Sequence, residues 1–553
     1  MKPFCSARLL FFITLFSLFF SLGSRSLNEP DEGRYAEIAR EMVESGNWMV
    51  PHFWYVPHLD KPPLTYWIVA ISLRCFGLNE WAVRIPVALA GFSGIWAIYL
   101  LGLNMGGKQV GMWSALILLS SLLYFVMSRF LTADIFLTQF IAWAMYCGWR
   151  SWRSLDAINS ADEERRAVSS RSAFFWQCGM WVFISLGFLV KGPIAGIIPL
   201  ISFLLLFAIL FHSGSHSADK QYFPPEITPN EWNILFKAKI HIFCLGSLGG
   251  IGLLVFMVLP WFVFIWQTIP GSFHYMTINQ FAGHALGTAI KNRGGPIYYF
   301  VPILLLGALP WTPLLGWVWS SKKRLFQNVN IHEGKILASA WITVTFILFS
   351  LSQSKLPAYI LPLFPGLALL LGLRWFSTDE QVKSTPPLLW KTVALLPCIE
   401  FILLIITGHF VFQIPVTSNM IGAGIIWIIL AIILTNRLSV TCCPVVAVIQ
   451  SLLLLYLVSA YLPLHETKLQ NNQTLKPLAQ SLKAKYQKGE KVVAWGYLPQ
   501  GFPFYAAPII NATNRAYIGG YSIHQVPFQF SPNIKQFGDH FISNHSDLLK
   551  ILS

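Results

Sequence analysis

The residues best suited to chemistry lie in a charged segment between the first two hydrophobic runs. The segment covers residues 29–67 and contains DEGRYAEIAREM, which begins at Asp31. A carboxylate here could act as a general base, or it could simply complement the positive end of a helix. Because adjacent side chains on a helix point in different directions, at most one of Asp31 and Glu32 is expected to face a site.

A second motif in the same segment, HLDKPPLTYW, places an acid and a base side by side. Two prolines follow Asp60 and Lys61, and they favour an extended backbone that holds both side chains in place. Lys61 could pair with a phosphate, and Asp60 could ligate a metal together with His52 or His58. The simpler alternative is a solvated ion pair.

Further charged residues stand at the ends of later hydrophobic runs. Arg129 and Asp134 lie in SRFLTADIFL, Lys191 in LVKGPIAG and Lys355 in SQSKLPAYILP. Side chains at such positions commonly extend toward the membrane surface without any further role. If they converge on one face with Lys61, they would suit an anionic lipid phosphate.

The composition requires a membrane protein. Hydrophobic residues make up 55% of the 553 residues and charged residues only 11%, whereas soluble domains carry about 25% charged residues. The net charge of +15 resides mainly in short loops between apolar runs. Basic loops of this kind set membrane topology, so the charge does not indicate nucleic-acid binding. The 8 Cys are scattered without metal-binding spacing or a disulfide pattern.

The spacing of apolar runs predicts about thirteen membrane-spanning helices. The segment 64–77 is too short to cross and is expected to be an interfacial helix. Residues 8–24 could be a cleaved signal peptide, but we favour an uncleaved first span because the topology needs this anchor. The predicted spans are 8–24, 82–104, 111–128, 133–149, 174–190, 193–212, 240–266, 297–319, 335–352, 356–373, 387–409, 419–435 and 440–462.

Loop charges give the orientation. With the N-terminus inside, the inner loops hold the basic clusters WRSWRS, EERRAVSSR and SSKKR, as the positive-inside rule requires. The same arrangement places one set of charged residues on the outer face: Asp31, Asp60, Lys61, Asp134, Lys191 and Lys355.

Two regions are therefore expected, an all-α membrane bundle over 1–462 and a small outer α/β domain over 463–553. The first outer loop of the bundle, 25–81, carries the interfacial helices. In the tail, TLKPLAQSLKAKYQKG predicts an amphipathic helix and KVVAWGY a strand, while FPFYAAPII and RAYIGGY predict further strand and turn structure.

One acid falls in the middle of a predicted span. Glu400 in LLPCIEFILLIITGH is expected either to pair with a polar group inside the bundle or to relay protons, as in a transporter. We favour structural pairing.

The motifs DEGRYAEIAREM, GNWMVP, DKPPLTYW, RFLTAD, KGPIA and SKLPAYILP occur in an order that resembles the membrane GT-C glycosyltransferases. More narrowly, the chain is similar to the lipid A 4-amino-4-deoxy-L-arabinose transferases, within the wider family related to protein O-mannosyltransferases. The resemblance covers roughly residues 24–362. It implies a GT-C type bundle and a periplasmic tail.

The resemblance also implies roles for individual residues. Between Phe273 and Pro296 the family commonly shows Glu-His-x-x-Arg-Phe, whereas this chain reads INQFAGHALGTAIKNRGGP. That segment therefore offers only candidates, including Arg293. The implied roles are catalysis for Asp31 and Asp134, binding of the donor phosphate for Arg34, Lys61, Lys191, Lys355, Tyr359 and Arg129, and binding of a divalent metal (Zn, or Mg or Mn) for Asp60, His274 and His284.

The implied reaction is an inverting transfer of a sugar, 4-amino-4-deoxy-L-arabinose, from undecaprenyl phosphate to lipid A phosphate. It would take place on the periplasmic face of a bacterial inner membrane. The implied partners are the polyprenyl-phosphate-linked sugar donor, lipid A or another glycolipid as acceptor, and membrane lipids, with no nucleic acid. One alternative keeps this chemistry but moves another sugar to lipopolysaccharide core or protein. A different class, a transporter or flippase for a lipid-linked sugar, would need polar residues inside the spans and repeat symmetry.

Overall fold

The computed structural model describes most of the bundle and parts of the tail. Every structural statement below concerns these residues. They are 6–157, 163–216, 229–282, 294–318, 329–376, 386–410, 418–437, 439, 442–487, 490, 492–495, 500–507, 509–510, 517–519 and 541–542, without 465–474.

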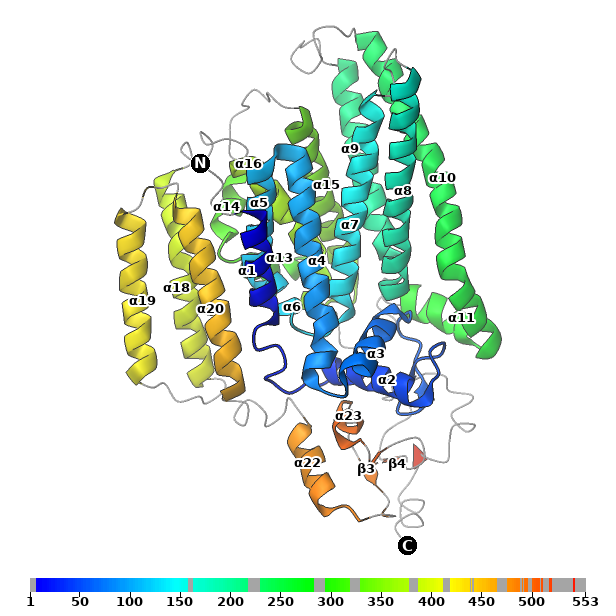
Figure 1. Cartoon of the computed structure of the whole chain (residues 1–553), viewed down its shortest axis with the longest axis vertical. Helices are drawn as coiled ribbons and strands as arrows, with labels where there is room; N and C mark the ends of the chain where they lie inside the picture. Colours follow the sequence, from blue (N-terminus) through cyan, green and yellow to red (C-terminus); the bar gives the residue numbers. More distant parts are fainter. Residues whose placement is uncertain are drawn as a thin grey trace.

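Every range predicted to span the membrane coincides with helical structure. The long helices run side by side as one bundle (Figure 1). Their bounds are α1 Ala7–Phe19, α4 Glu80–Gly106, α5 Lys108–Ser120, α7 Ala133–Ser154, α8 Glu163–Lys191, α9 Ile194–His216, α10 Pro229–Thr268, α15 Val329–Leu351, α16 Leu363–Trp375, α18 Pro387–Phe410, α19 Ser418–Arg437 and α20 Cys443–Leu464.

Several predicted spans are broken, which the apolar pattern did not reveal. The range 111–128 contains α5 and a short α6 (Leu122–Met127), and 297–319 contains α13 (Phe300–Gly307) and α14 (Thr312–Val318). Pro310 lies within the second break, where the carbonyl of Leu309 accepts a hydrogen bond from Leu122 N at 3.2 Å. By length and hydropathy, five helices among the described residues could each cross a membrane unaided. The protein is a multi-pass membrane protein, but the number of crossings stays a prediction.

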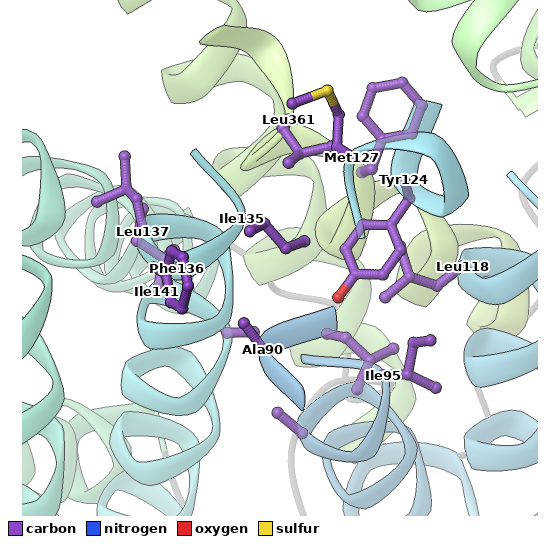
Figure 2. Packing of buried hydrophobic residues seen from close by; sticks show 14 of the residues in the cluster. Ala90, Ile95, Leu118, Tyr124, Met127, Ile135, Phe136, Leu137, Ile141 and Leu361 are labelled. Atoms are coloured by element: carbon purple, nitrogen blue, oxygen red, sulfur yellow. The ribbon is translucent and has the colours of Figure 1, made fainter. Parts of the chain in front are cut away.

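The core of the bundle is built where α4, α5, α6 and α7 meet (Figure 2). The hydroxyl of Tyr124 on α6 donates to the carbonyl of Gly91 on α4 at 2.9 Å. Glycine is needed at Gly91, because a Cβ there would lie 2.5 Å from Cβ of Ser128. Close helix packing through small residues is typical of membrane bundles, where apolar burial alone does not drive association.

The first loop folds against one end of the bundle, below the long helices in Figure 1. It contains α2 (Asp31–Ser45), a short antiparallel hairpin of β1 (His52–Phe53) and β2 (Val56–Pro57), and α3 (Leu64–Phe76). The helix over 64–77 was therefore predicted correctly. It lies beside α2, not among the long helices (Figure 1).

The tail lies beyond α2 and α3 at the same end of the bundle (Figure 1). Helix α22 (Lys476–Lys485) and strand β3 (Val493–Trp495) occupy the positions predicted for a helix and a strand. β3 pairs in parallel with β4 (Tyr517–Gly519), which pairs in parallel with β5 (Phe541–Ile542). The expectation of strand in FPFYAAPII was wrong, because residues Phe502–Ala506 form the short helix α23.

Separate ion pairs lie at the two ends of α7. Asp134 lies in the first turn of α7 and Arg153 in its last turn. At 1.5 Å per residue they are separated by roughly 30 Å, about the thickness of a hydrocarbon core. Arg153 pairs with Asp156 at 2.6 Å and with Glu333, near the start of α15, at 3.0 Å. Asp134 instead pairs with Lys191 at the end of α8, and the charges of both residues act on Lys61 in the first loop, beside α2.

Candidate active site

Asp31 begins α2 and has a cation immediately beside it. Its Oδ1 accepts a hydrogen bond from Arg34 Nη2 at 2.7 Å, one helical turn away. The side chain of Asp31 is 35% exposed, whereas that of the neighbouring Glu32 is fully buried. An accessible carboxylate held by a guanidinium is available to a ligand as either a base or an acceptor.

The buried neighbour fixes the turn in place. Glu32 accepts hydrogen bonds from Arg84 Nε at 2.9 Å and Arg84 Nη2 at 2.8 Å, and from Arg25 Nη1 at 2.8 Å. The backbone N–H groups of Asn28 and Leu131 also donate to it. Although burial would raise the pKa of Glu32, Arg25 and Arg84 outweigh it and hold the pKa at about 2. Glu32 therefore holds the start of α2 in place through its ion pairs, and Asp31 is the acid that remains accessible to a ligand.

A second ion pair lies at the ends of α7 and α8. Asp134 Oδ1 accepts from Lys191 Nζ, and both side chains are only 8% exposed. The ammonium of Lys191 also stands 3.9 Å from the centre of the Tyr359 ring. A cation over a ring face is stabilised by the electrons of the ring. Residues 134, 191 and 359 thus meet although they belong to three separate parts of the chain.

Lys61 is close enough to Arg34 and to the Asp134–Lys191 pair for their charges to shift its pKa. Burial lowers the pKa of Lys61 to about 8, and the positive charge of Lys191 adds to this effect. Asp60 and Asp134 oppose the shift, and Arg34 reinforces it. A lysine among other cations binds an anion well, because the anion relieves their mutual repulsion.

Asp60 is held by the segment that follows α10. Tyr275 donates its hydroxyl hydrogen to Asp60 Oδ1, and Gln280 Nε2 lies 3.3 Å from the same oxygen. These two residues belong to the π-helical turn Tyr275–Ala282. His58 Nε2 is 3.8 Å from Asp60 Oδ2. Burial would raise the pKa of Asp60, but His58 and the hydrogen bond from Tyr275 outweigh it and lower the pKa.

The described residues do not assemble a metal site. No group of three or more His, Cys, Asp or Glu side chains with suitable geometry occurs among them. His274 is exposed on the short helix Ser272–His274, while His284 and Arg293 lie outside the described residues. Asp60 and His58 alone would leave a divalent ion poorly ligated.

Arg129 is directed elsewhere. Its Nη1 donates to the carbonyls of Ser17 at 3.0 Å and Leu18 at 2.8 Å, and its Nη2 to that of Phe20 at 2.6 Å. These carbonyls terminate α1 and lack partners within the helix, so the guanidinium completes the helix end. The guanidinium of Arg129 is thus bound to the end of α1 and is not part of the proposed site. Lys355 is buried at the same end of the bundle, and its Nζ donates to the carbonyl of Ser352.

Two tyrosines that were not predicted from the sequence pack beside the cluster of charged residues. Tyr35 and Tyr66 are buried and stacked, with ring centres 5.5 Å apart. The guanidinium of Arg34 lies 5.8 Å from the ring centre of Tyr35. Burial raises the pKa of Tyr35, Arg34 opposes this, and Asp31 and Asp134 add to it. The position of Tyr35 directly after Arg34 in DEGRYAE was the available signal.

Glu400 does not belong to this cluster. Its Oε1 is buried within α18 and has no hydrogen-bond partner in the described part of the chain. The favoured structural pairing is thus not seen for that atom.

Known proteins match both the sequence and the fold. Residues 4–246 match the dolichyl-phosphate-mannose-protein mannosyltransferase family. Undecaprenyl phosphate-alpha-4-amino-4-deoxy-L-arabinose arabinosyl transferase 1 of Proteus mirabilis is 30% identical over 380 residues, which are 68% of this chain and 60% of that protein. The corresponding transferase of Edwardsiella ictaluri is 31% identical over 65% of this chain and 57% of its own length. The chain thus aligns with less than two thirds of either relative.

The crystal structures of ArnT from Cupriavidus metallidurans share the fold. The apo form superimposes with a TM-score of 0.72 at 20% identity, over 98% of this chain and 90% of ArnT. The form bound to undecaprenyl phosphate gives 0.70 at 21% identity, over 93% and 86%.

The chain is a polytopic membrane protein, and these similarities show that it has the GT-C fold. Within that class its sequence is similar to the aminoarabinose transferases, and its fold matches that of ArnT along nearly its whole length. The resemblance inferred from the motifs is confirmed.

Proposed function

We propose that this chain is an inverting glycosyltransferase that moves 4-amino-4-deoxy-L-arabinose from undecaprenyl phosphate to a phosphate of lipid A. We place the reaction on the periplasmic face of a bacterial inner membrane. The names of the sequence relatives support the donor and the sugar, and one structural neighbour was crystallised with undecaprenyl phosphate.

The observation that carries the proposal is the position of Asp31 beside Arg34 in a cluster that also holds Lys61 and Lys191. Cleavage of a sugar from a polyprenyl phosphate leaves the bonding electron pair on a phosphate oxygen. Arg34, Lys61 and Lys191 supply positive charge where this negative charge develops, and preorganised charge of this kind lowers the barrier most effectively.

Asp31 serves the attacking group in this mechanism. With a hydroxyl acceptor, the Asp31 carboxylate takes the proton as the oxygen attacks the anomeric carbon from the face opposite the phosphate. A phosphate acceptor is already ionised, so Asp31 and its neighbours position it instead. A single displacement inverts the anomeric carbon and forms no covalent sugar–enzyme intermediate.

Asp134 is proposed to act through Lys191. Its carboxylate holds the ammonium group, which also contacts Tyr359. Lys355 and Tyr359 belong to the stretch after α15 and would line the donor cavity.

The test uses purified protein in liposomes with undecaprenyl phosphate-aminoarabinose and lipid A. Mass spectrometry should detect lipid A with one added aminoarabinose, and free undecaprenyl phosphate should appear in equal amount. Transfer of the sugar to core oligosaccharide or protein alone would redirect the acceptor assignment. Donor movement across the bilayer without transfer would establish a flippase and contradict the proposal.

A further inference from the structure

The C-terminal tail contacts the turn that carries Asp31. Gly501, which precedes α23, donates its N–H to Glu29 Oε1 at 2.8 Å. The two backbones also touch at Gly33, where a Cβ would lie only 2.7 Å from Cα of Gly501. A side chain at Gly501 is equally restricted, since a Cβ there would lie 2.8 Å from Cα of Gly33. This contact therefore has no space for a side chain on either backbone.

A second contact joins the tail to the same short segment. Tyr505 on α23 accepts a hydrogen bond from Leu27 N through its hydroxyl oxygen at 2.7 Å. Its hydroxyl lies 3.3 Å from Glu80 Oε1, which also accepts from Lys476 Nζ at 2.6 Å. Helices α22 and α23 thus both contact the N-terminal end of α4, and α23 also contacts the chain that enters α2.

These contacts bracket Asp31 in the sequence. Leu27 and Glu29 precede it by four and two residues, and Gly33 follows it by two. On the other side of the turn, Glu32 is bound by the buried Arg84. The backbone at Asp31 is therefore held between the bundle and the tail.

From this arrangement we infer that the tail positions the catalytic acid, with Gly501 and Glu29 as positioning residues for Asp31. The inference rests on the proposed transferase function. Neither residue is required to touch the substrate. A displacement of about 1 Å in a reacting group can cost about 100-fold in rate, so a contact two residues away is sufficient to matter.

The principal test is Gly501→Ala in the full-length protein, assayed in liposomes. Its Cβ would push the tail away from Gly33, so kcat should fall by about 10-fold or more while the KM for the donor stays within about twofold. Hydrogen exchange of the amides in 27–33 should accelerate. Gly249→Ala on α10 is the matched control, because a Cβ there meets nothing within 4 Å.

A pair of variants at position 29 separates the hydrogen bond from the charge. Glu29→Gln keeps an oxygen that can accept from Gly501 N and should retain the wild-type kcat. Glu29→Ala removes the acceptor and should lower kcat as Gly501→Ala does. A purely structural role would instead lower the amount of folded protein in both alanine variants and leave the kcat of the folded fraction unchanged.

The outcomes are distinct. Wild-type kcat in Gly501→Ala would overturn the positioning role, whether or not exchange in 27–33 changes. Unchanged exchange in that segment would overturn the coupling between tail and turn. Wild-type protein without transfer activity would instead refute the proposed function, and the positioning role would fall with it.

Discussion

Arg84 holds Glu32 in a bidentate ion pair across 52 residues of sequence, with both side chains fully buried. Two parallel hydrogen bonds between a guanidinium and a carboxylate fix direction as well as distance. The pair joins the first helix of the loop to the first turns of α4. It also explains why two adjacent acids differ in exposure, since Glu32 is buried in this ion pair and Asp31 remains accessible.

Glu32→Gln should destabilise the protein severely. The substitution leaves Arg84 buried beside a neutral amide, and breaking one side of a buried pair costs about 3–5 kcal/mol. Thermal unfolding in detergent should show a large fall in Tm. Replacing both residues, as Glu32→Leu with Arg84→Leu, should cost less than the single change, because the fully buried guanidinium of Arg84 is then no longer left without its carboxylate, and Arg25 is 24% exposed and can contact water. A larger loss in the double variant would contradict this account.

Lys61 should make donor binding depend on pH. With its pKa lowered to about 8, mainly by burial, Lys61 is charged below that pH and becomes neutral above it. Affinity for an anionic donor is therefore complete below pH 8 and weakens as pH rises, by up to about tenfold per pH unit. Lys61→Arg stays charged and should flatten the profile of KM against pH above pH 8. An unchanged profile in that variant would assign the titration to another group.

Asp134 and Lys191 should behave as one unit. In a double-mutant cycle with Asp134→Asn and Lys191→Met, we expect a coupling energy of about 0.5–3 kcal/mol for donor affinity. Lys191→Met alone should be the more harmful change, because it leaves a buried carboxylate uncompensated. Asp134→Asn combined with Lys485→Met on α22 provides the control, and those effects should add. Additivity in the first cycle would show that the pair is not coupled.

Substitutions of Arg129 and Arg34 should have different effects, the first on stability and the second on donor binding. Arg129→Ala removes hydrogen bonds to the last carbonyls of α1 and should cost about 1–3 kcal/mol of stability with the donor KM unchanged. Arg34→Ala should raise the donor KM, because the phosphate loses a charge partner. Tm and KM measured on both variants provide the check. A raised KM in Arg129→Ala would return that residue to the site.

The sequence predicted the bundle and the convergence of the site because both depend on simple periodic rules. Apolar runs of spanning length located the helices, and alternating loop charge placed Asp31, Lys61, Asp134 and Lys191 at one end. The breaks near Ser121 and Pro310 were not predicted, since an apolar run stays apolar across a break. Such a break becomes evident only when another segment satisfies the freed backbone groups.

Contacts between side chains and backbone groups far apart in the chain could not be predicted from the sequence. Arg129 has the composition and position of a phosphate ligand, yet it completes the end of α1, a segment 109–112 residues earlier. The predicted strand near Phe502 failed for a related reason. Local pattern cannot distinguish five apolar residues in a strand from a short helix packed against α2.

The most direct test of the central claim is Asp31→Asn in reconstituted liposomes. The variant keeps the size and the hydrogen-bonding capacity of the side chain but loses its charge. Transfer to lipid A should fall by about 100-fold or more, because the phosphate acceptor loses the carboxylate that helps to position it, with donor binding and Tm preserved. Asp156→Asn at the opposite end of the bundle should retain full activity. Transfer at the wild-type rate in Asp31→Asn would contradict the account.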